Sequence, residues 1–134
     1  MIEKSDKKDT RKITLGKEGE KLAADFLKKS GYKIVEVNYR CPIGEIDIVA
    51  RDKNEVVFVE VKARKSSALG YPEEAVGVKK QKKMSQLANW YLQEKKLKDS
   101  SARFDVVAVL MLPSGNDVRL IRNAFDFISY EKRN

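Results

Sequence analysis

The sequence predicts an α/β fold with a mixed central sheet of about five strands flanked by helices. Two segments have the apolar spacing of amphipathic helices, and five shorter segments are rich in β-branched residues. One helical segment precedes three of the strand-like segments and the other precedes the last two, which gives the order α-β-β-β-α-β-β. Because two main helices are available to cover the sheet, we expect one helix on each face.

Both helices are predicted from an apolar stripe with helical spacing. The first is expected over Leu15–Ser30, ending at Gly31. Its apolar face comprises Leu15, Leu22, Phe26 and Leu27. The second is expected over Glu73–Lys96, with a break at Gly77. Its core stripe comprises Met84, Leu87, Ala88, Tyr91 and Leu92.

The strands are bounded by turn-forming residues. They are expected at Tyr32–Tyr39, Glu45–Arg51, Val56–Ala63, Phe104–Leu112 and Val118–Arg122. Pro42-Ile43-Gly44 breaks the chain after the first strand, and residues 52–55 turn the second strand back as a hairpin with the third. Residues 66–72 are expected to form a loop, and a short helix is expected at Asn123–Phe127.

Composition limits the chemistry that this chain can perform. It has 134 residues, no histidine and one cysteine, Cys41. The missing histidine excludes imidazole bases and histidine-built zinc sites, so that a metal would be held by carboxylate and backbone oxygens, which suit Mg²⁺ or Mn²⁺. A net charge of +8 indicates a polyanionic partner, either nucleic acid or an anionic membrane surface; a solvated lysine-rich surface is the alternative.

The length and the charged N-terminus bear on domain organisation. We expect a flexible charged tail over residues 1–12 and a single domain over residues 13–130. No apolar run approaches the roughly 18 residues that a membrane span needs. Without a secretory signal or a cysteine pair, we expect a cytoplasmic protein.

The predicted hairpin gathers charge on one face. With residues 53–54 as a two-residue turn, counting outward places Asp47 opposite Glu60. The same count places Glu45 opposite Lys62. Side chains alternate with period two, so all four point to one side. The opposite face is expected to be apolar, with Ile46, Ile48, Val57, Val59 and Val61.

Facing carboxylates repel each other, so something positive should compensate Asp47 and Glu60. Lys62 is one candidate, and a bound divalent cation is another. A surface ladder of salt bridges is the alternative interpretation of these four charges.

Three segments carry a resemblance to a known family. They are Gly44–Ala50 (GEIDIVA), Val57–Arg64 (VFVEVKAR) and Arg103–Val107 (RFDVV). Together they resemble the YraN-type family of small bacterial proteins, which is assigned to the restriction-endonuclease-like, PD-(D/E)xK superfamily and is similar to archaeal Holliday junction resolvases. The resemblance runs from about Leu15 to Arg122. Ile46 stands where the name motif of the superfamily has proline. Many members of the superfamily also lack this proline.

The resemblance implies a nuclease site built around Mg²⁺ or Mn²⁺. It implies that Asp47 and Glu60 ligate the metal, with the backbone carbonyl of Val61 as a third ligand. Lys62 would then orient or help to deprotonate the attacking water and stabilise charge on the scissile phosphate.

Further residues are assigned to the same site by resemblance. Glu20 matches the first-helix glutamate of the family and would complete the metal shell or position water; the alternative is an exposed carboxylate paired with a lysine. Glu45 is a candidate for supporting the metal ligands, or is simply a partner of Lys62. Gln81 lies where related nucleases often place a polar helix residue near the metal.

Lysines cluster directly after Gly77, at residues 79, 80, 82 and 83. If the second helix starts near Val78, they occupy its first turns, where free backbone N–H groups attract anions. Phosphates would then contact Lys79, Lys80 and Lys83, and the track would extend to Arg64 and Lys65. If the helix instead starts at Glu73, the lysines are ordinary solvated surface.

Four other side chains are assigned either a structural or a nucleic-acid-binding role. Trp90 and Tyr91 are expected to pack in the core, with base stacking as the alternative. Tyr71 is a loop candidate for contacting nucleic acid. Asp105 is expected to be structural, paired with Arg103 or Arg40.

The leading hypothesis is a metal-dependent endonuclease that hydrolyses phosphodiester bonds in DNA, on branched or damaged structures. The alternative is a nucleic-acid-binding module that retains the nuclease fold without catalytic activity. Membrane binding is not expected, because no helix combines a basic face with large exposed apolar residues. Symmetric cutting of two strands would favour a homodimer.

Overall fold

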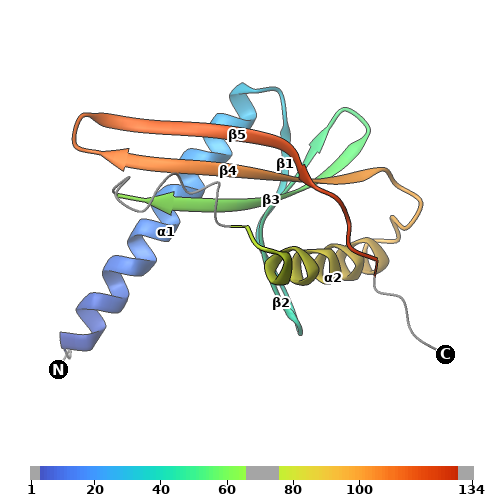
Figure 1. Ribbon diagram of the computed structural model, residues 1–134, viewed down its shortest axis with the longest axis horizontal. Helices are drawn as coiled ribbons and strands as arrows, with labels where there is room; N and C mark the ends of the chain where they lie inside the picture. The colour runs from blue at the N-terminus through green and yellow to red at the C-terminus, as the bar shows by residue number, and fades with distance from the viewer. Residues whose placement is uncertain (1–3, 66–75, 130–134) are drawn as a thin grey trace.

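A computed structural model describes residues 4–65 and 76–129, with side chains from residue 15 onward. The elements are α1 (Lys4–Lys29), β1 (Lys33–Cys41), β2 (Gly44–Asp52), β3 (Glu55–Arg64), α2 (Val78–Glu94), β4 (Ala102–Leu112) and β5 (Gly115–Phe125). The predicted order is confirmed, and the strands form one sheet in the order β1-β2-β3-β4-β5 (Figure 1).

The sheet is mixed, as predicted. β3 and β4 run parallel, whereas the other three neighbouring pairs are antiparallel. A parallel pair needs a crossover connection, and the chain between β3 and β4 contains α2. β1 and β5 are therefore the edge strands.

The helices cover opposite faces of the sheet, because each packs on its own apolar cluster (Figure 1). α1 contributes Ala23 and Leu27 to a cluster with the β-branched residues of β2, β3 and β4. α2 contributes all five residues of the predicted stripe to a second cluster, together with Phe58 and Phe104. Over the described residues, neither helix has an apolar stretch long enough to cross a membrane.

Two glycines allow the helices to approach the sheet. A Cβ atom at Gly19 would lie 2.6 Å from the Cβ of Ala63, so a side chain there would push α1 away from β3. Gly44 has φ +147° and lies against Leu87 and Lys83 of α2, where a Cβ would come within 3.3 Å of the Leu87 side chain.

Several predicted boundaries change in the structure. α1 begins at Lys4, so its first turns overlap the expected tail over residues 1–12. α2 begins at Val78, with Gly77 as its N-cap. The short helix expected at Asn123–Phe127 is wrong, because β5 continues to Phe125, which pairs with Phe104 of β4 beyond a shift in the register. The expected loop at 66–72, with Tyr71, lies outside the described residues.

The predicted hairpin register is confirmed from the turn as far as Ile48, which pairs with Val59. One face assignment is wrong: Ile46 packs in the α2 cluster, whereas Ile48 packs in the α1 cluster. Ile46 and Ile48 are two positions apart and should point to the same face, but they point to opposite faces. The alternation of side chains along β2 therefore breaks at Asp47. Local patterning does not indicate this break, because it depends on how β2 meets its neighbours.

A largely buried ionic network lies at the β2–β3 turn and the start of β4. The Arg103 guanidinium contacts Asp52, Glu55 and Asp105, with N–O distances of 2.8, 2.7 and 3.0 Å. Asp105 is fully buried and also accepts hydrogen bonds from the Tyr32 hydroxyl and from the Asn123 backbone N–H. The expected Arg103–Asp105 pair is thus confirmed. Burial and the hydrogen bond to Asp105 raise the pKa of Tyr32 to about 12, so this hydroxyl keeps its proton.

Candidate functional site

Asp47 lies where β2 and β3 cease to pair. The backbone register of the two strands ends at Ile48 and Val59. Beyond that point, Oδ2 of Asp47 accepts a hydrogen bond from the Val61 backbone N–H at 2.8 Å. A side-chain oxygen of Asp47 therefore takes the place of the main-chain acceptor that a continuing β-ladder would supply. This bond fixes the carboxylate against β3, and Oδ1 takes no part in it.

The Val61 carbonyl shares the edge of β3 that Asp47 contacts. In a strand, the N–H and C=O groups of one residue project to the same side. Since the Val61 N–H points to Asp47, the Val61 carbonyl also points toward β2, at the place where the ladder has ended. The predicted third ligand thus lies on the same edge as the two predicted carboxylates.

Electrostatic repulsion is concentrated at Asp47. Burial and repulsion from Glu60 raise the pKa of Asp47 to about 7, and Glu20 adds to the repulsion. The Val61 hydrogen bond and the charge of Lys80 oppose this rise in the pKa. The three carboxylates proposed from the sequence therefore share one electrostatic environment.

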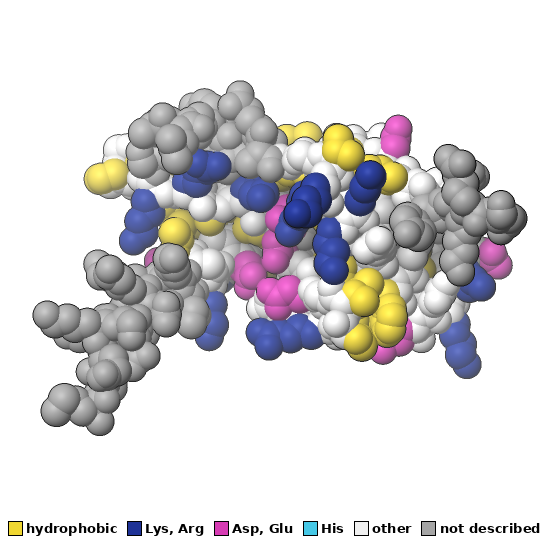
Figure 2. Space-filling model, turned by 60° about the horizontal axis from the view of Figure 1, so that its bottom comes forward, with side chains coloured by type: hydrophobic (Ala, Val, Ile, Leu, Met, Phe, Trp, Pro, Cys, Tyr) yellow, Lys and Arg dark blue, Asp and Glu magenta, His cyan; other side chains and the backbone are white. Residues whose placement is uncertain are grey.

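Glu60 is buried and is flanked by two ammonium groups. Its residue exposure is 9%, and its Oε2 lies 3.6 Å from Nζ of Lys62 and 3.4 Å from Nζ of Lys80. Lys62 comes from the same strand, whereas Lys80 comes from the first turns of α2. On the face where α2 comes forward, Figure 2 shows acidic side chains bordered by a group of Lys and Arg side chains. The site thus joins a carboxylate pair to a basic helix end.

α1 brings Glu20 to this site from the other face of the sheet. The close approach of Gly19 to Ala63 sets the position of the helix beside β3. Oε1 of Glu20 accepts a hydrogen bond from the Asn38 side-chain amide at 3.0 Å. Glu20 is therefore oriented by a β1 residue. Among the side chains that the structure describes, it forms no ion pair with a lysine, the alternative that the sequence left open.

Asn38 has an unusual backbone conformation next to the site. Its φ is +57°, which is left-handed and uncommon for a strand residue. The residues on either side of Asn38 pair with those on either side of Asp47, so the two face each other across β1 and β2. Asparagine tolerates this conformation better than most residues do. The left-handed residue of β1 thus lies opposite the break in β2.

We expect Asn38→Ala to destabilise the protein by about 1 kcal/mol more than Asn38→Gly. Both variants lose the hydrogen bond to Glu20, but only glycine adopts the left-handed conformation without strain. Denaturant unfolding of the two variants measures the difference. Equal stabilities would show that the backbone at Asn38 stores no strain.

Other residues that the sequence proposed lie apart from the carboxylates. Glu45 pairs with Arg40 at 3.2 Å, and both side chains are exposed, so its expected place opposite Lys62 is wrong. The Gln81 amide donates to the Val76 carbonyl and lines a small cavity against β4 and β5. Neither residue contacts Asp47 or Glu60 in the hydrogen bonds and ion pairs of the described chain.

The lysines after Gly77 occupy the first turns of α2, because the helix begins at Val78. The expectation of phosphate contact required this start, whereas a start at Glu73 would have favoured ordinary solvated surface. The first turn contains no acidic residue, and the Gly77 cap supplies no side-chain hydrogen bond. An open groove of about 720 Å³ is lined by Gly77, Lys79, Lys80, Lys82, Lys83 and Gln86. Lys80 belongs to both features, because it lines this groove and also contacts Glu60.

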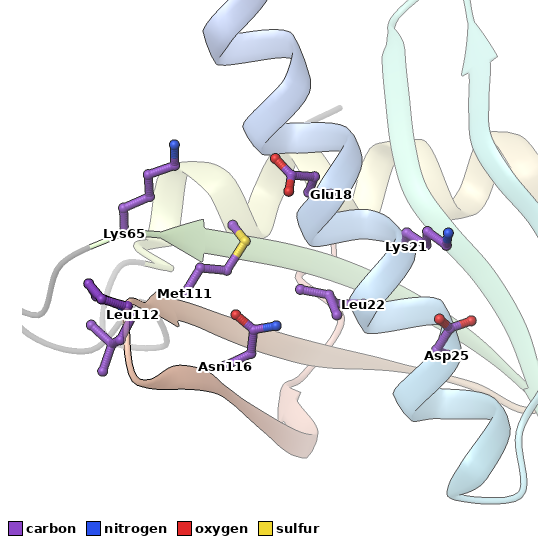
Figure 3. Close-up of a pocket in the computed structure, with 9 residues that line it drawn as sticks. Glu18, Lys21, Leu22, Asp25, Lys65, Met111, Leu112 and Asn116 are labelled. Carbon is purple, nitrogen blue, oxygen red and sulfur yellow. The ribbon is translucent and has the colours of Figure 1, made fainter.

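A second groove, of about 610 Å³, lies between α1 and the β4–β5 hairpin (Figure 3). Its polar lining comprises Glu18, Lys21, Asp25, Lys65 and Asn116. These charges are mixed in sign, and neither Asp47 nor Glu60 lines the groove. Lys65 therefore faces a different surface from the lysines of α2.

The donor set around Asp47 fits a hard divalent cation. Mg²⁺ is commonly held by one or two carboxylates and completes its shell with water and phosphate oxygens. Asp47, Glu60 and the Val61 carbonyl supply oxygens of this kind, and burial together with repulsion from Glu60 raises the pKa of Asp47. Among the described residues, no group of three or more His, Cys, Asp or Glu side chains is arranged to hold a metal ion.

Comparison with known sequences identifies the family. The model of the family described as "Uncharacterised protein family UPF0102" matches residues 19–109. A UPF0102 protein of Syntrophus aciditrophicus is 50% identical over 117 residues, covering 87% of this chain and 92% of the relative. The chain belongs to the UPF0102 family. A UPF0102 protein of Caldicellulosiruptor saccharolyticus is 47% identical over 116 residues, covering 85% of this chain and 98% of the relative.

The UPF0102 family is the YraN-type family that the sequence resembles. The UPF0102 match spans Glu20, Asp47, Glu60, Lys62 and Lys80, so the whole site lies within the family region.

Two contributors to this UPF0102 site do not follow from sequence reasoning. The sequence assigns Lys80 to phosphate binding, whereas its contact with Glu60 depends on how α2 crosses the sheet. Asn38 has no predicted role in the site. The sequence signal that could have indicated Asn38 is an asparagine within a strand rich in β-branched residues, since asparagine is depleted in strands.

Proposed function

We propose that this chain is a Mg²⁺- or Mn²⁺-dependent endonuclease that hydrolyses phosphodiester bonds in DNA. The observation that carries the proposal is that Asp47 and Glu60, from adjacent strands, lie close enough to repel each other. This repulsion, together with burial, raises the pKa of Asp47, and two lysines flank Glu60. Hydrolysis joins a water oxygen to phosphorus, breaks the bond to one sugar oxygen and returns a proton to that leaving oxygen.

Under this proposal each residue has a defined task. Asp47 and Glu60 would hold the metal together with the Val61 carbonyl, and the metal supplies Lewis acidity and a more acidic water. Lys62 would orient water or stabilise negative charge on the phosphate. Glu20, held by Asn38, would position water at the edge of the shell.

A second candidate is a nucleic-acid-binding module without catalysis. The observation that favours it is that Lys62 and Lys80 both lie within ion-pair distance of Glu60. Two ammonium groups already neutralise this carboxylate, so the acidic pair is partly compensated by the protein itself. Cleavage assays distinguish the candidates.

The test is cleavage of branched, nicked and single-stranded DNA by the wild type, Asp47→Ala and Glu60→Ala, with Mg²⁺ or Mn²⁺. We expect metal-dependent products from the wild type alone. Glu45→Ala is the matched control, because Glu45 is an exposed carboxylate of the same strand paired with Arg40. Binding without cleavage in every protein would favour the second candidate, and cleavage that persists in both Asp47→Ala and Glu60→Ala would place the chemistry elsewhere.

The lysine groove should bind phosphates of the nucleic acid. We expect the combined variant Lys79→Ala, Lys82→Ala, Lys83→Ala to flatten the dependence of log K on log salt by up to about 0.7 to 0.9 for each phosphate that a lysine no longer neutralises. The measurement is DNA affinity across a salt series. Lys28→Ala, Lys29→Ala, Lys33→Ala controls for net charge, since it also removes three exposed lysines, from the last turn of α1 and the start of β1. Equal slopes in the two variants would contradict a specific role for the groove.

A further inference from the structure

Trp90 lies on the outer face of α2. The inner face of the helix is buried on the sheet through Met84, Ser85, Leu87, Ala88, Tyr91 and Leu92. Trp90 has 39% of its surface exposed, whereas Tyr91 has 3%. The expectation of core packing is therefore confirmed for Tyr91 and wrong for Trp90. The exposed ring is available for contact with a partner, and tryptophan is enriched at interfaces.

Five of the exposed residues of α2 form a stripe that includes Trp90. Lys79, Lys83, Gln86, Trp90 and Gln93 follow each other at intervals of four and three, so they share one face of the helix. All five are exposed, and none is acidic. We call this set the α2 stripe. It combines cations at its start, amides along its length and one aromatic ring.

The α2 stripe begins beside the proposed catalytic carboxylates. Lys80 follows Lys79 and contacts Glu60, so the start of the stripe adjoins the acidic pair. Ten residues separate Lys80 from Trp90, which corresponds to about 15 Å along the helix.

We infer that the α2 stripe binds an unpaired strand of nucleic acid, with Trp90 stacked on a base. This inference rests on the proposed function and names the form of its substrate. Base faces in a duplex are covered by their neighbours, whereas unpaired bases present them to aromatic side chains. Lysines at the start of the stripe complement the phosphates, and the amides of Gln86 and Gln93 can bond to base edges. The lysines thus bind phosphates of either form, and the ring selects a strand that is not base-paired.

The chain provides its own probe, because Trp90 is its only tryptophan. We would titrate the wild type with a thymidine-only oligonucleotide and with a duplex of equal length, in EDTA to prevent cleavage. We expect the single strand to change the Trp90 fluorescence strongly and the duplex to change it little. Emission that is unchanged at saturation with single strand would overturn the inference.

Variants test whether the ring contributes affinity. Trp90→Ala should weaken single-strand binding about tenfold and leave duplex binding nearly unchanged, and Trp90→Phe should recover part of the loss. Val78→Ala is the matched control, since Val78 is 61% exposed on the same helix but outside the stripe. Single-strand affinity in Trp90→Ala equal to that of the wild type would also overturn the inference. If Trp90→Ala proves unfolded in thermal melts, the wild-type titration and Trp90→Phe decide.

The outcome can be separated from that of the nuclease proposal. Trp90-dependent single-strand binding without any Asp47-dependent cleavage would refute the nuclease and support the stripe. Cleavage that requires Asp47 but proceeds equally well in Trp90→Ala, with unchanged single-strand affinity, would support the nuclease and refute the stripe.

Discussion

Replacing Arg103 with leucine is expected to destabilise the protein by about 3 to 5 kcal/mol, the range for removing one partner of a buried ion pair. The Arg103 side chain is 13% exposed and binds three carboxylates, of which Asp105 is fully buried. Without the guanidinium, the negative charge of Asp105 would be left in a low-dielectric interior. The cost is a large share of the stability of a domain of this size.

The loss should be visible as a fall in melting temperature of about 10 to 20 °C. Arg40→Leu is the matched control, because Arg40 forms an ion pair with Glu45 and its side chain is 80% exposed. An exposed pair contributes about 1 kcal/mol or less, so this variant should melt close to the wild type. Similar losses in the two variants would contradict the importance of the buried network.

A second substitution tests the mechanism of the loss. Adding Asp105→Asn to Arg103→Leu should recover part of the stability, because it removes the uncompensated charge. Its amide oxygen can still accept from the Asn123 N–H, and its N–H₂ group can donate to the Tyr32 hydroxyl oxygen. A double variant less stable than Arg103→Leu would show that the arginine acts through packing instead.

Asp47→Asn is expected to stabilise the metal-free protein above pH 7, by about 1 to 3 kcal/mol. Burial and repulsion from Glu60 raise the pKa of Asp47 to about 7 in the folded state, whereas an unfolded aspartate titrates near 3.9. Asparagine is neutral at every pH and still offers an oxygen to the Val61 N–H, so the variant removes the repulsion and keeps the hydrogen bond.

The pH dependence has a definite sign. The folded state holds the proton of Asp47 more tightly than the unfolded state, so it loses stability as the pH rises from about 4 to about 7. The stability of Asp47→Asn minus that of the wild type should therefore grow across this window and level off above it. Urea unfolding at several pH values measures it, and a difference that is flat with pH would contradict the raised pKa.

The same pair of proteins tests the metal site. Mg²⁺ or Mn²⁺ should raise the melting temperature of the wild type and not that of Asp47→Asn, since a ligand of the folded state stabilises it by mass action. The order of stability should thus reverse when metal is added. Equal stabilisation of both proteins would place the bound metal away from Asp47.

The sequence alone determined the order of elements and most of the hairpin. Periodicity of apolar residues requires only local information, so the two helices, the five strands and the register of Ile48 with Val59 follow from it directly. Asp47 and Glu60 lie one position beyond the last pair of this register, so the sequence also predicts that they are neighbours. The short helix expected at residues 123–127 is wrong because pairing with β4, a distant contact, extends β5.

Only the tertiary structure decided which charges meet. Lys80 reaches Glu60 because α2 crosses the sheet, and Glu20 reaches the site because Gly19 lets α1 approach β3. The break of β2 at Asp47, the left-handed Asn38 and the exposure of Trp90 also depend on contacts between segments far apart in the chain. The acidic pair of the hairpin is therefore a local feature, whereas its electrostatics and its connection to a basic helix face arise from packing.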